Sequence, residues 1–426
     1  MATFCLRNES QFTVLHSFAD GYPNASLVLG GDGGLYGTVG TDAGCSLFRI
    51  TTNGAFSIVH SFARCEDGVW SADLLAARDG SLYGTAVERG TDSIYKIATN
   101  GVVTVLHSFS RNEHPHGLLL CSDGNLFGTL PMIGPMPPTN GGGVVYRIAA
   151  DGAFTILHSF IPRGEGINPR HLVRTGDGRL YGATEFGPMF KISSDDSFRT
   201  LKVFFGPSSL MVGHNEKVYG TSRSTIFEIA TNDFVSVLQS FNGETEAVGP
   251  GDLIQASDGT LYGTSYSCAR DNAGSLFKIT SDGTLTLLHK FTGGEDGRNP
   301  TGLLPARDGS LYGVTASGID RKSGTLFRLR GGKFILVCAL GEGAGMPDIE
   351  GDDGNLYGTG DAANRRTIFK ITPMGRLTIV HTLSKDEWLQ GRLARGSDGN
   401  LYGVTAVYGV TAGHSSGRIF RIGTRR

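Results

Sequence analysis

The chain has 426 residues, a formal net charge of -2 and 39% hydrophobic residues. Its 64 glycines are about twice the usual share, yet no G-X-Y period is present, which excludes collagen and favours many tight turns between short strands. The near-neutral charge excludes an electrostatic footprint for nucleic acid or anionic membrane, and no apolar run reaches the ~18–20 residues of a membrane-spanning helix.

The N-terminal residues M-A-T-F-C-L-R-N-E-S-Q contain no basic segment followed by an apolar stretch, so no signal peptide is visible. Phe4–Arg7 resembles an isolated copy of a later strand and has no predicted place. The first clear strand is Thr13–Phe18, T-V-L-H-S-F, which precedes any complete repeat.

From there on, the chain repeats four strand-like elements at steps of 38 to 54 residues. A short aliphatic pair comes first, then D-G-x-L-Y-G, then an apolar-aromatic-x-apolar element, then a copy of T-V-L-H-S-F. The L-Y-G element is centred on nine aromatic residues: Tyr36, Tyr83, Phe127, Tyr181, Tyr219, Tyr262, Tyr312, Tyr357 and Tyr402. Each element has the length and the Gly, Asp or Asn boundaries of a β-strand.

Four short strands in each repeat of about 45 residues predict an all-β fold, a β-propeller of four-stranded blades. Nine repeats predict nine blades in one domain spanning residues 1–426. The unit Ser208–Phe241 is the shortest and has Asn215-Glu216 in place of D-G, so eight blades is the alternative. The chain ends after a third strand, Ile419–Ile422, and we therefore expect Thr13–Phe18 to complete the C-terminal blade.

The combination of D-G-x-L-Y-G-T-T, F-K-I, N-G-x-x-T-V-L-H-S-F and D-G-x-x-P resembles the GloVer tandem repeat of bacterial proteins, and Phe291–Phe327 is the closest stretch. The resemblance covers essentially the whole chain. It implies an exported, surface-anchored protein and brings no assigned reaction or catalytic residues. This chain shows no leader or anchor of its own.

The two tight turns of each repeat, D-G before the second strand and N-G or D-G before the fourth, suit two-residue hairpins in which both central residues have positive φ. They share one edge of a blade. The other two connections share the opposite edge, and they vary from Glu185–Pro188 to Pro131–Gly143. Because loops on a rigid scaffold carry function, we expect the functional site on this variable edge.

Six histidines recur at one position of the fourth strand: His16, His60, His107, His158, His289 and His381. A residue that repeats with the fold is expected to be structural, sharing a side with the flanking Phe and hydrogen-bonding between strands or blades. The N-G turn at Asn53 places Cys45 opposite Phe62, near Cys65, so a Cys45–Cys65 disulfide is one pairing left open. The spacing of the six cysteines fits no zinc site.

Non-repeating residues in the variable loops are the binding candidates. Trp70 and Trp388, in inter-blade loops, could stack on a sugar or anchor a partner, or could fill the blade edge. His114 and His116 lie beside Glu113 but lack a third fixed metal ligand. A calcium ion at Asp20–Pro23 or Asp296–Pro300 is an alternative without the acid spacing of a dedicated loop.

The leading hypothesis is a monomeric, non-catalytic scaffold that binds carbohydrate or protein through its variable loops, without cofactor, nucleic acid or membrane span. One alternative is a purely structural surface protein. The other is a propeller lyase or hydrolase, whose candidate residues are the charged loop residues Glu88, Arg89, Asp92, Glu113, His114, Arg270 and Asp271.

Overall fold

The structure is a computed structural model, and it describes most of the chain. The described ranges are 11–23, 26–41, 44–63, 74–88, 91–109, 115–131, 141–185, 187–201, 209–222, 224–240, 249–266, 273–317, 323–342, 345–362, 365–407 and 416–424. Within these ranges the regular structure is β-strand, and no helix long and apolar enough to cross a membrane occurs there.

The chain groups into two compact units, each a series of antiparallel four-stranded sheets, here called blades. Unit 1 comprises residues Met1–Pro115 and Pro347–Arg426, and unit 2 comprises His116–Met346. The expectation of a single domain stays a prediction.

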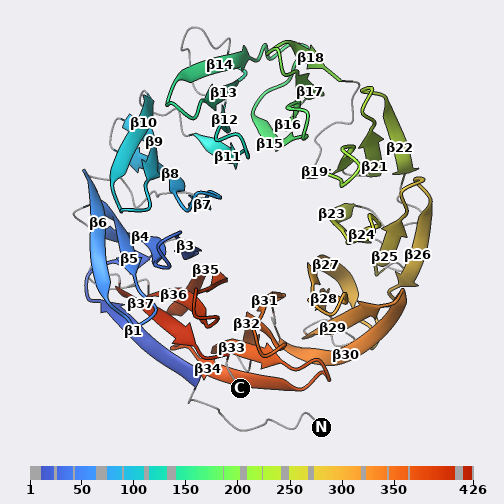
Figure 1. Cartoon of the computed structure of the whole chain (residues 1–426). Coiled ribbons are helices and arrows are strands. Elements are labelled where there is room, and N and C mark those ends of the chain that lie inside the picture. The colour runs from blue at the N-terminus through green and yellow to red at the C-terminus, as the bar shows by residue number, and fades with distance from the viewer. Residues whose placement is uncertain are drawn as a thin grey trace. The chain divides into compact units, whose positions relative to one another are not determined.

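The described part of unit 1 holds four blades (Figure 1). Blade 8 contains β31 (Pro347–Glu350), β32 (Leu356–Ala362), β33 (Arg365–Ile371) and β34 (Leu377–Thr382). Blade 9 contains β35 (Glu387–Arg395), β36 (Leu401–Val407), β37 (Ser416–Ile422) and β1 (Phe12–Phe18). Blade 1 contains β2 (Tyr22–Pro23), β3 (Val28–Leu29), β4 (Leu35–Thr41), β5 (Gly44–Ile50) and β6 (Phe56–Ala63), with β2 and β3 both paired to β4. Blade 2 contains β7 (Leu75–Ala76), β8 (Leu82–Glu88), β9 (Thr91–Ile97) and β10 (Val103–Phe109).

The described part of unit 2 holds five blades. Blade 3 contains β11 (His116–Leu120), β12 (Leu126–Leu130), β13 (Val144–Ile148) and β14 (Phe154–Ser159). Blade 4 contains β15 (Pro169–Arg174), β16 (Leu180–Thr184), β17 (Met189–Ile192) and β18 (Phe198–Thr200). Blade 5 contains β19 (Ser209–Val212), β20 (Val218–Thr221), β21 (Thr225–Ile229) and β22 (Val235–Ser240). Blade 6 contains β23 (Pro250–Gln255), β24 (Leu261–Ser265), β25 (Ser275–Ile279) and β26 (Leu285–Lys290). Blade 7 contains β27 (Arg298–Pro305), β28 (Leu311–Ser317), β29 (Ser323–Arg330) and β30 (Lys333–Glu342).

The fold is therefore an all-β propeller, and nine blades are present in the described part of the chain. The short unit around Asn215 forms a complete sheet of its own, blade 5, so the eight-blade alternative is wrong. Strand β1 pairs antiparallel with β37, from Phe12 opposite Ile422 to Phe18 opposite Gly417. The N-terminal strand thus completes the C-terminal blade, as the order of the repeats predicted. Phe4–Arg7 lies outside the described residues.

The D-G turns differ in one respect from the two-residue hairpins expected from the sequence. At Gly396–Asn400 the N–H of Gly399 donates to the carbonyl of Gly396, and Gly399 alone takes a positive φ, 81°. This is a tight turn followed by a left-handed glycine, the pattern of a three-residue hairpin. The aspartate before the glycine keeps an ordinary φ, and its side chain is free to accept hydrogen bonds.

The glycine of L-Y-G is required by the packing within each blade. A Cβ at Gly37 would lie 2.6 Å from Phe48 Cζ and 2.9 Å from Leu27, because the Phe48 ring of the third strand lies across the glycine. The same third-strand aromatic faces the corresponding glycine in seven other blades, at Gly84, Gly128, Gly182, Gly220, Gly263, Gly313 and Gly403. The glycine of the L-Y-G element and the aromatic residue of the apolar-aromatic-x-apolar element therefore pack directly against each other.

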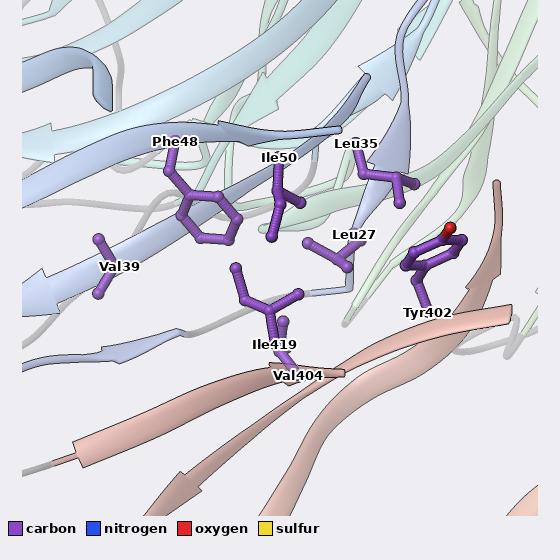
Figure 2. Close-up of a cluster of buried hydrophobic side chains, with 8 residues drawn as sticks. All are labelled: Leu27, Leu35, Val39, Phe48, Ile50, Tyr402, Val404 and Ile419. Atoms are coloured by element: carbon purple, nitrogen blue, oxygen red, sulfur yellow. The ribbon is translucent and has the colours of Figure 1, made fainter. Parts of the chain in front are cut away.

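The core consists of clusters between consecutive blades within a unit. Figure 2 shows one of them, in which five side chains of blade 1 meet three of blade 9: Leu27, Leu35, Val39, Phe48 and Ile50 with Tyr402, Val404 and Ile419. Each of these residues is at most 3% exposed. The facing sides of blades 1 and 9 therefore close around one shared hydrophobic cluster.

The recurring histidines stack on rings of the next blade. His16 of blade 9 lies parallel to Phe56 of blade 1 with ring centroids 3.8 Å apart, and His381 of blade 8 lies parallel to Phe12 of blade 9 at 3.7 Å. In unit 2, His158 stacks on Phe198 and His289 on Phe334. Ring stacking of these four histidines therefore links neighbouring blades, a contact that the prediction of hydrogen bonds between strands or blades did not include.

Hydrogen bonds from the histidines run to the chain that follows the same strand. His158 Nε2 lies 2.9 Å from Glu165 Oε2, and His289 Nε2 lies 2.9 Å from Asp296 Oδ2. The Asp296 carboxylate also accepts the N–H of Thr292. The oxygens proposed for calcium at Asp296–Pro300 therefore already have protein donors, and the calcium site stays a prediction.

Cys45 is buried on β5, directly opposite Phe62, as the turn at Asn53 predicted. Cys45 is disulfide-bonded. Cys65 lies outside the described residues, so the Cys45–Cys65 pairing stays a prediction. Cys121 and Cys338 are free thiols.

The glycine contact gives a direct stability prediction. We expect Gly37→Ala to lower the free energy of unfolding by about 1–3 kcal/mol, because the new methyl group must displace the Phe48 ring. Chemical denaturation measures the loss. Gly423→Ala, where the nearest atom lies 3.9 Å from the new Cβ, is the control and should be close to wild type. Equal stability of the two variants would contradict the packing explanation.

The stacked histidines also predict a dependence of stability on pH. Burial lowers the pKa of His16 from its usual 6.5, so the unfolded chain binds a proton more readily than the folded one. Neutral His16 therefore contributes stability at pH values above the pKa that it has in the unfolded chain. This contribution is lost as pH falls through its lower pKa in the folded protein. Between about pH 7.5 and pH 5, we expect the melting temperature of wild type to fall further than that of His16→Phe. Parallel pH profiles for the two proteins would show that His16 does not contribute.

Candidate functional site

The edge of each blade that carries the D-G turns is called the D-G edge, and the opposite one the loop edge. At the D-G edge of blade 1, Asp32 Oδ1 accepts the N–H of Gly34, and Oδ2 accepts Tyr36 Oη at 3.1 Å and Arg49 Nε at 2.6 Å. Burial acts to raise the pKa of Asp32, but the hydrogen bonds from Gly34, Arg49 and Tyr36 outweigh it and hold the pKa below its usual value.

The same arrangement explains the repeated phrase D-G-x-L-Y-G. Tyr357 donates to Asp353 at 2.8 Å, and Tyr402 donates to Asp398 at 2.9 Å. The third strands supply a cation in eight repeats: Arg49, Lys96, Arg147, Lys191, Lys278, Arg328, Lys370 and Arg421. In blade 5 the third strand carries an anion, Glu228, in place of the cation, and it forms an ion pair with Lys217 at 2.9 Å. The charged groups of this motif therefore stabilise the hairpins.

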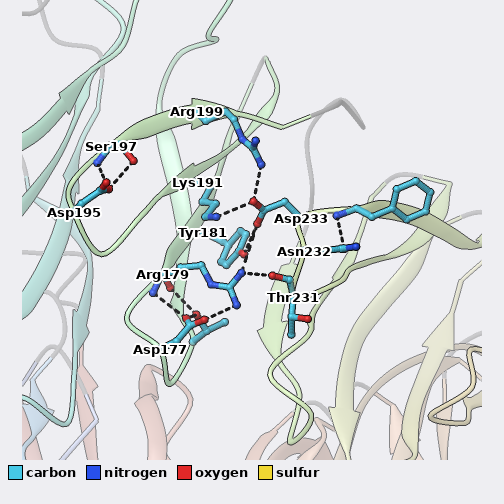
Figure 3. A network of polar contacts seen from close by, with 12 residues as sticks. Asp177, Arg179, Tyr181, Lys191, Asp195, Ser197, Arg199, Thr231, Asn232 and Asp233 are labelled. Carbon is cyan, nitrogen blue, oxygen red and sulfur yellow. Dashed lines mark hydrogen bonds and ion pairs between the residues drawn. The ribbon is translucent and has the colours of Figure 1, made fainter.

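Asp233, at the D-G edge of blades 4 and 5, is the centre of a larger network (Figure 3). Its carboxylate accepts Lys191 Nζ at 2.8 Å, Arg199 at 2.6 Å and Tyr181 Oη at 3.0 Å. Asp233 has a φ of 67° at a turn position where most repeats have glycine. Val203, which occupies the histidine position in the sequence of this repeat, lies outside the described residues. The Asp233 network joins blades 4 and 5.

A metal centre finds no support in the described residues, among which no group of three or more His, Cys, Asp or Glu side chains could hold a metal ion.

Most of the predicted site residues cannot be placed. Trp70, Arg89, Glu113, His114, Arg270 and Asp271 lie outside the described residues. Glu88 ends strand β8, and nothing further is described of it.

The three remaining candidates lie in strands and not in loops. Asp92 is buried within β9, 2% exposed and opposite Val87 and Phe109. His116 begins β11 opposite Thr129 and is exposed. Trp388 is the second residue of β35, opposite Ala406. The loops are shorter than the sequence suggested because the ladder hydrogen bonds extend into them.

Trp388 has the geometry expected of a contact residue. Its side chain is 46% exposed although its backbone is held in the β35–β36 ladder. The guanidinium of Arg366, from β33 of blade 8, lies over the indole ring. Because β35 begins after the connection from blade 8, Trp388 lies at the loop edge.

The carboxylate next to Trp388 serves the scaffold. Glu387 is 2% exposed, and it accepts the hydroxyl of Thr405 at 2.6 Å and that of Ser384 at 3.2 Å. Arg418, on β37, lies 3.8 Å from Glu387. The Glu387 carboxylate therefore fixes the start of β35.

Asp348, on the first strand of blade 8, is not among the residues predicted above to form a site. It lies at an irregularity between Pro347 and Ile349, and its Oδ2 is shielded from solvent with no hydrogen-bond partner in the described structure. Burial raises the pKa of Asp348 to about 6, partly offset by the N–H of Leu393 and the charge of Arg392 on β35. The sequence does carry a signal: five residues before the first turn residue of D-G, blade 8 has Asp348 where the other eight repeats have leucine, at Leu27, Leu74, Leu118, Leu172, Leu210, Leu253, Leu303 and Leu393.

The family model described as the Gloeobacter/Verrucomicrobia repeat matches residues 22–225 and 207–387. The chain belongs to this repeat family. The match covers the repeats recognised above and brings no ligand or reaction to this family member. No curated protein matches its sequence.

Solved structures resemble this Gloeobacter/Verrucomicrobia repeat protein in fold. Dipeptidyl peptidase 4 of Porphyromonas gingivalis has a TM-score of 0.54 at 9% identity, over 92% of this chain and 66% of the peptidase. At that identity the likeness shows the fold alone. Weaker matches are a protein from Lactobacillus plantarum, with a TM-score of 0.43 at 16% identity over 76% of this chain and 96% of that one, and a gluconolactonase from Xanthomonas campestris, with a TM-score of 0.34 at 13% identity over 65% and 89%.

Asp348 predicts an unusual response of stability to pH. Its folded-state pKa of about 6 lies above the ordinary 3.8, so the stability of the neutral form is present below pH 3.8 and is lost as pH rises through about 6. Asp348→Asn keeps an acceptor for Leu393 and cannot ionise. We expect it to be more stable than wild type by about 2 kcal/mol at neutral pH and to differ little at about pH 4. Urea denaturation at both pH values tests this, and a destabilised variant at neutral pH would contradict it.

Proposed function

We propose that the protein is a non-catalytic binding scaffold that recognises a carbohydrate at the loop edge of blade 9. The observation that carries the proposal is Trp388, a half-exposed indole on a paired strand. An indole combines an apolar face with a polar N–H, and aromatic side chains dominate the energetics of many binding surfaces.

The setting of Trp388 suits recognition with little ordering cost. The β35–β36 ladder fixes its backbone, and the guanidinium of Arg366 limits the orientations of the ring. A side chain that is already ordered loses little conformational entropy when a ligand binds. The remaining exposed ring surface is then available for the apolar face of a sugar ring.

The carboxylates of the D-G edge and Asp92 are held within the fold, which favours a binding function over a catalytic one. The aspartates of the D-G edge are engaged by tyrosines and strand-three cations, as at Asp32 and Asp353. Asp92, the one enzyme candidate whose side chain is described, is buried within a sheet. A protein partner would bind at the same loop edge. Whether an oligosaccharide or a protein binds there distinguishes these two possibilities.

Substitution of Trp388 tests the proposal. We expect Trp388→Ala to weaken binding of its oligosaccharide at least tenfold, about 1.4 kcal/mol, because the ring contact is lost, and Trp388→Phe to retain part of it. Titration calorimetry with a panel of neutral and acidic oligosaccharides measures the affinities.

Met374→Ala is the matched control, since Met374 is a 93% exposed apolar side chain in a turn at the D-G edge of blade 8. It should bind like wild type. Equal affinities of Trp388→Ala and wild type for every sugar that binds would sink the proposal.

A further inference from the structure

The first strands β31, β35 and β3 of three consecutive blades in unit 1 lie side by side. Between Gln390 and Ala394, strand β35 departs from regular pairing with β36, and Gly391 takes a φ of 70°. Such bulges commonly re-aim a side chain. Here the residue that follows the left-handed glycine is Arg392.

Side chains of both neighbouring blades hold this bulge. The N–H of Arg392 donates to Ser26 Oγ, from blade 1, at 2.7 Å. The next N–H along the chain, that of Leu393, donates to Asp348 of blade 8. A Cβ at Gly391 would clash with the backbone of Ser26, which leaves no space for another residue there. The backbone of Arg392 is therefore fixed from two sides.

The side chain of Arg392 is exposed and forms no salt bridge with another described residue. Other arginines of these strands serve the scaffold. Arg395, three residues further on, binds the carboxylate of Asp352 and the carbonyl of Glu350. Arg174, at the equivalent place in blade 4, binds Asp123 at 2.5 Å. Arg392 is thus a rigidly placed cation with an open guanidinium, on the same strand as Trp388.

We propose that Arg392 binds the carboxylate of an acidic oligosaccharide, of the uronic acid class, whose sugar ring lies on Trp388. This inference rests on the proposed function and names its ligand. Arg392 lies four residues after Trp388, at most about 13 Å along a strand, a span that two or three linked sugar rings can bridge. A guanidinium binds a carboxylate through two parallel hydrogen bonds, which supplies specificity.

Asp348 makes this recognition depend on pH. Strand β31, which carries Asp348, packs against β32 and β35. The charged and titratable groups on these elements are Arg392, Arg395 and Glu387 on β35, Glu350 on β31 itself, Tyr357 on β32, and Asp352 and Asp353 in the intervening turn. Arg395 is engaged with Asp352, Glu387 with Thr405, and Tyr357 with Asp353. Arg392 is the remaining counter-charge. When Asp348 ionises, as pH rises through about 6, its charge competes with the ligand for Arg392, and affinity falls.

The test uses the full chain, with trigalacturonate as the acidic probe and galactotriose as the neutral one, in titration calorimetry at about pH 5 and pH 7.5. We expect tighter binding of trigalacturonate, weakened at the higher pH. Arg392→Ala should reduce its affinity at least tenfold and leave galactotriose unchanged. Lys385→Ala removes an exposed cation from the same blade and should change neither. In Asp348→Asn the affinity for trigalacturonate should no longer fall with pH.

Equal affinity of wild type for the two probes, or unchanged binding of trigalacturonate by Arg392→Ala, would overturn the inference. In either case a loss of binding in Trp388→Ala would leave the proposed function intact. Unchanged binding in Trp388→Ala together with a loss in Arg392→Ala would instead contradict the proposed function and keep the anion site. Binding of neither probe would contradict both.

Discussion

Within each blade the fold depends on one close contact, the third-strand aromatic ring lying across the glycine of L-Y-G. At Gly37 the Phe48 ring occupies the space that any side chain would need. Once that ring is in place, the flanking leucines and the next blade's side chains close around it, as in the cluster of Leu27, Phe48 and Tyr402. The repeated phrase therefore reflects a packing constraint that is shown in eight of the nine described blades.

Two kinds of contact join neighbouring blades in addition to the hydrophobic clusters. In the described part of the chain, four blades carry on their fourth strand a histidine that stacks on a phenylalanine of the following blade, as His158 does on Phe198. Between blades 4 and 5, Asp233 binds Lys191 and Arg199. Ring stacking depends on dispersion and the Asp233 network depends on charge, and both hold neighbouring blades together.

The groups proposed for binding differ from the charged groups that serve the scaffold. Aspartates of the D-G turns, such as Asp32, accept hydrogen bonds from their own hairpins, and Arg395 of the first strand β35 binds a turn of the preceding blade. Trp388 and Arg392 share β35 but keep exposed surface, and Asp348 carries a buried carboxyl whose ionisation costs stability.

The repeat alone allowed the fold class, the number of blades and the closure by β1 to be predicted, because strand length, turn residues and hydrophobic pattern are local properties that recur nine times. It also identified Trp388 as a candidate, since a residue outside the repeat is visible by contrast. It misjudged the turn geometry at Asp398, and it placed Asp92 and Trp388 in loops, because the ends of strands depend on partners that a single segment does not reveal.

What only the tertiary structure decided is the environment of single side chains. In the sequence Arg392 is an ordinary charged residue, and Asp348 differs from its repeat only as an aspartate in place of a leucine. Their burial, exposure and mutual approach arise where the first strands of blades 8, 9 and 1 meet, between residues distant in the chain, such as Ser26 and Arg392. A pKa or an open guanidinium depends on which atoms surround the group, and the sequence determines that only through the complete packing of the blades.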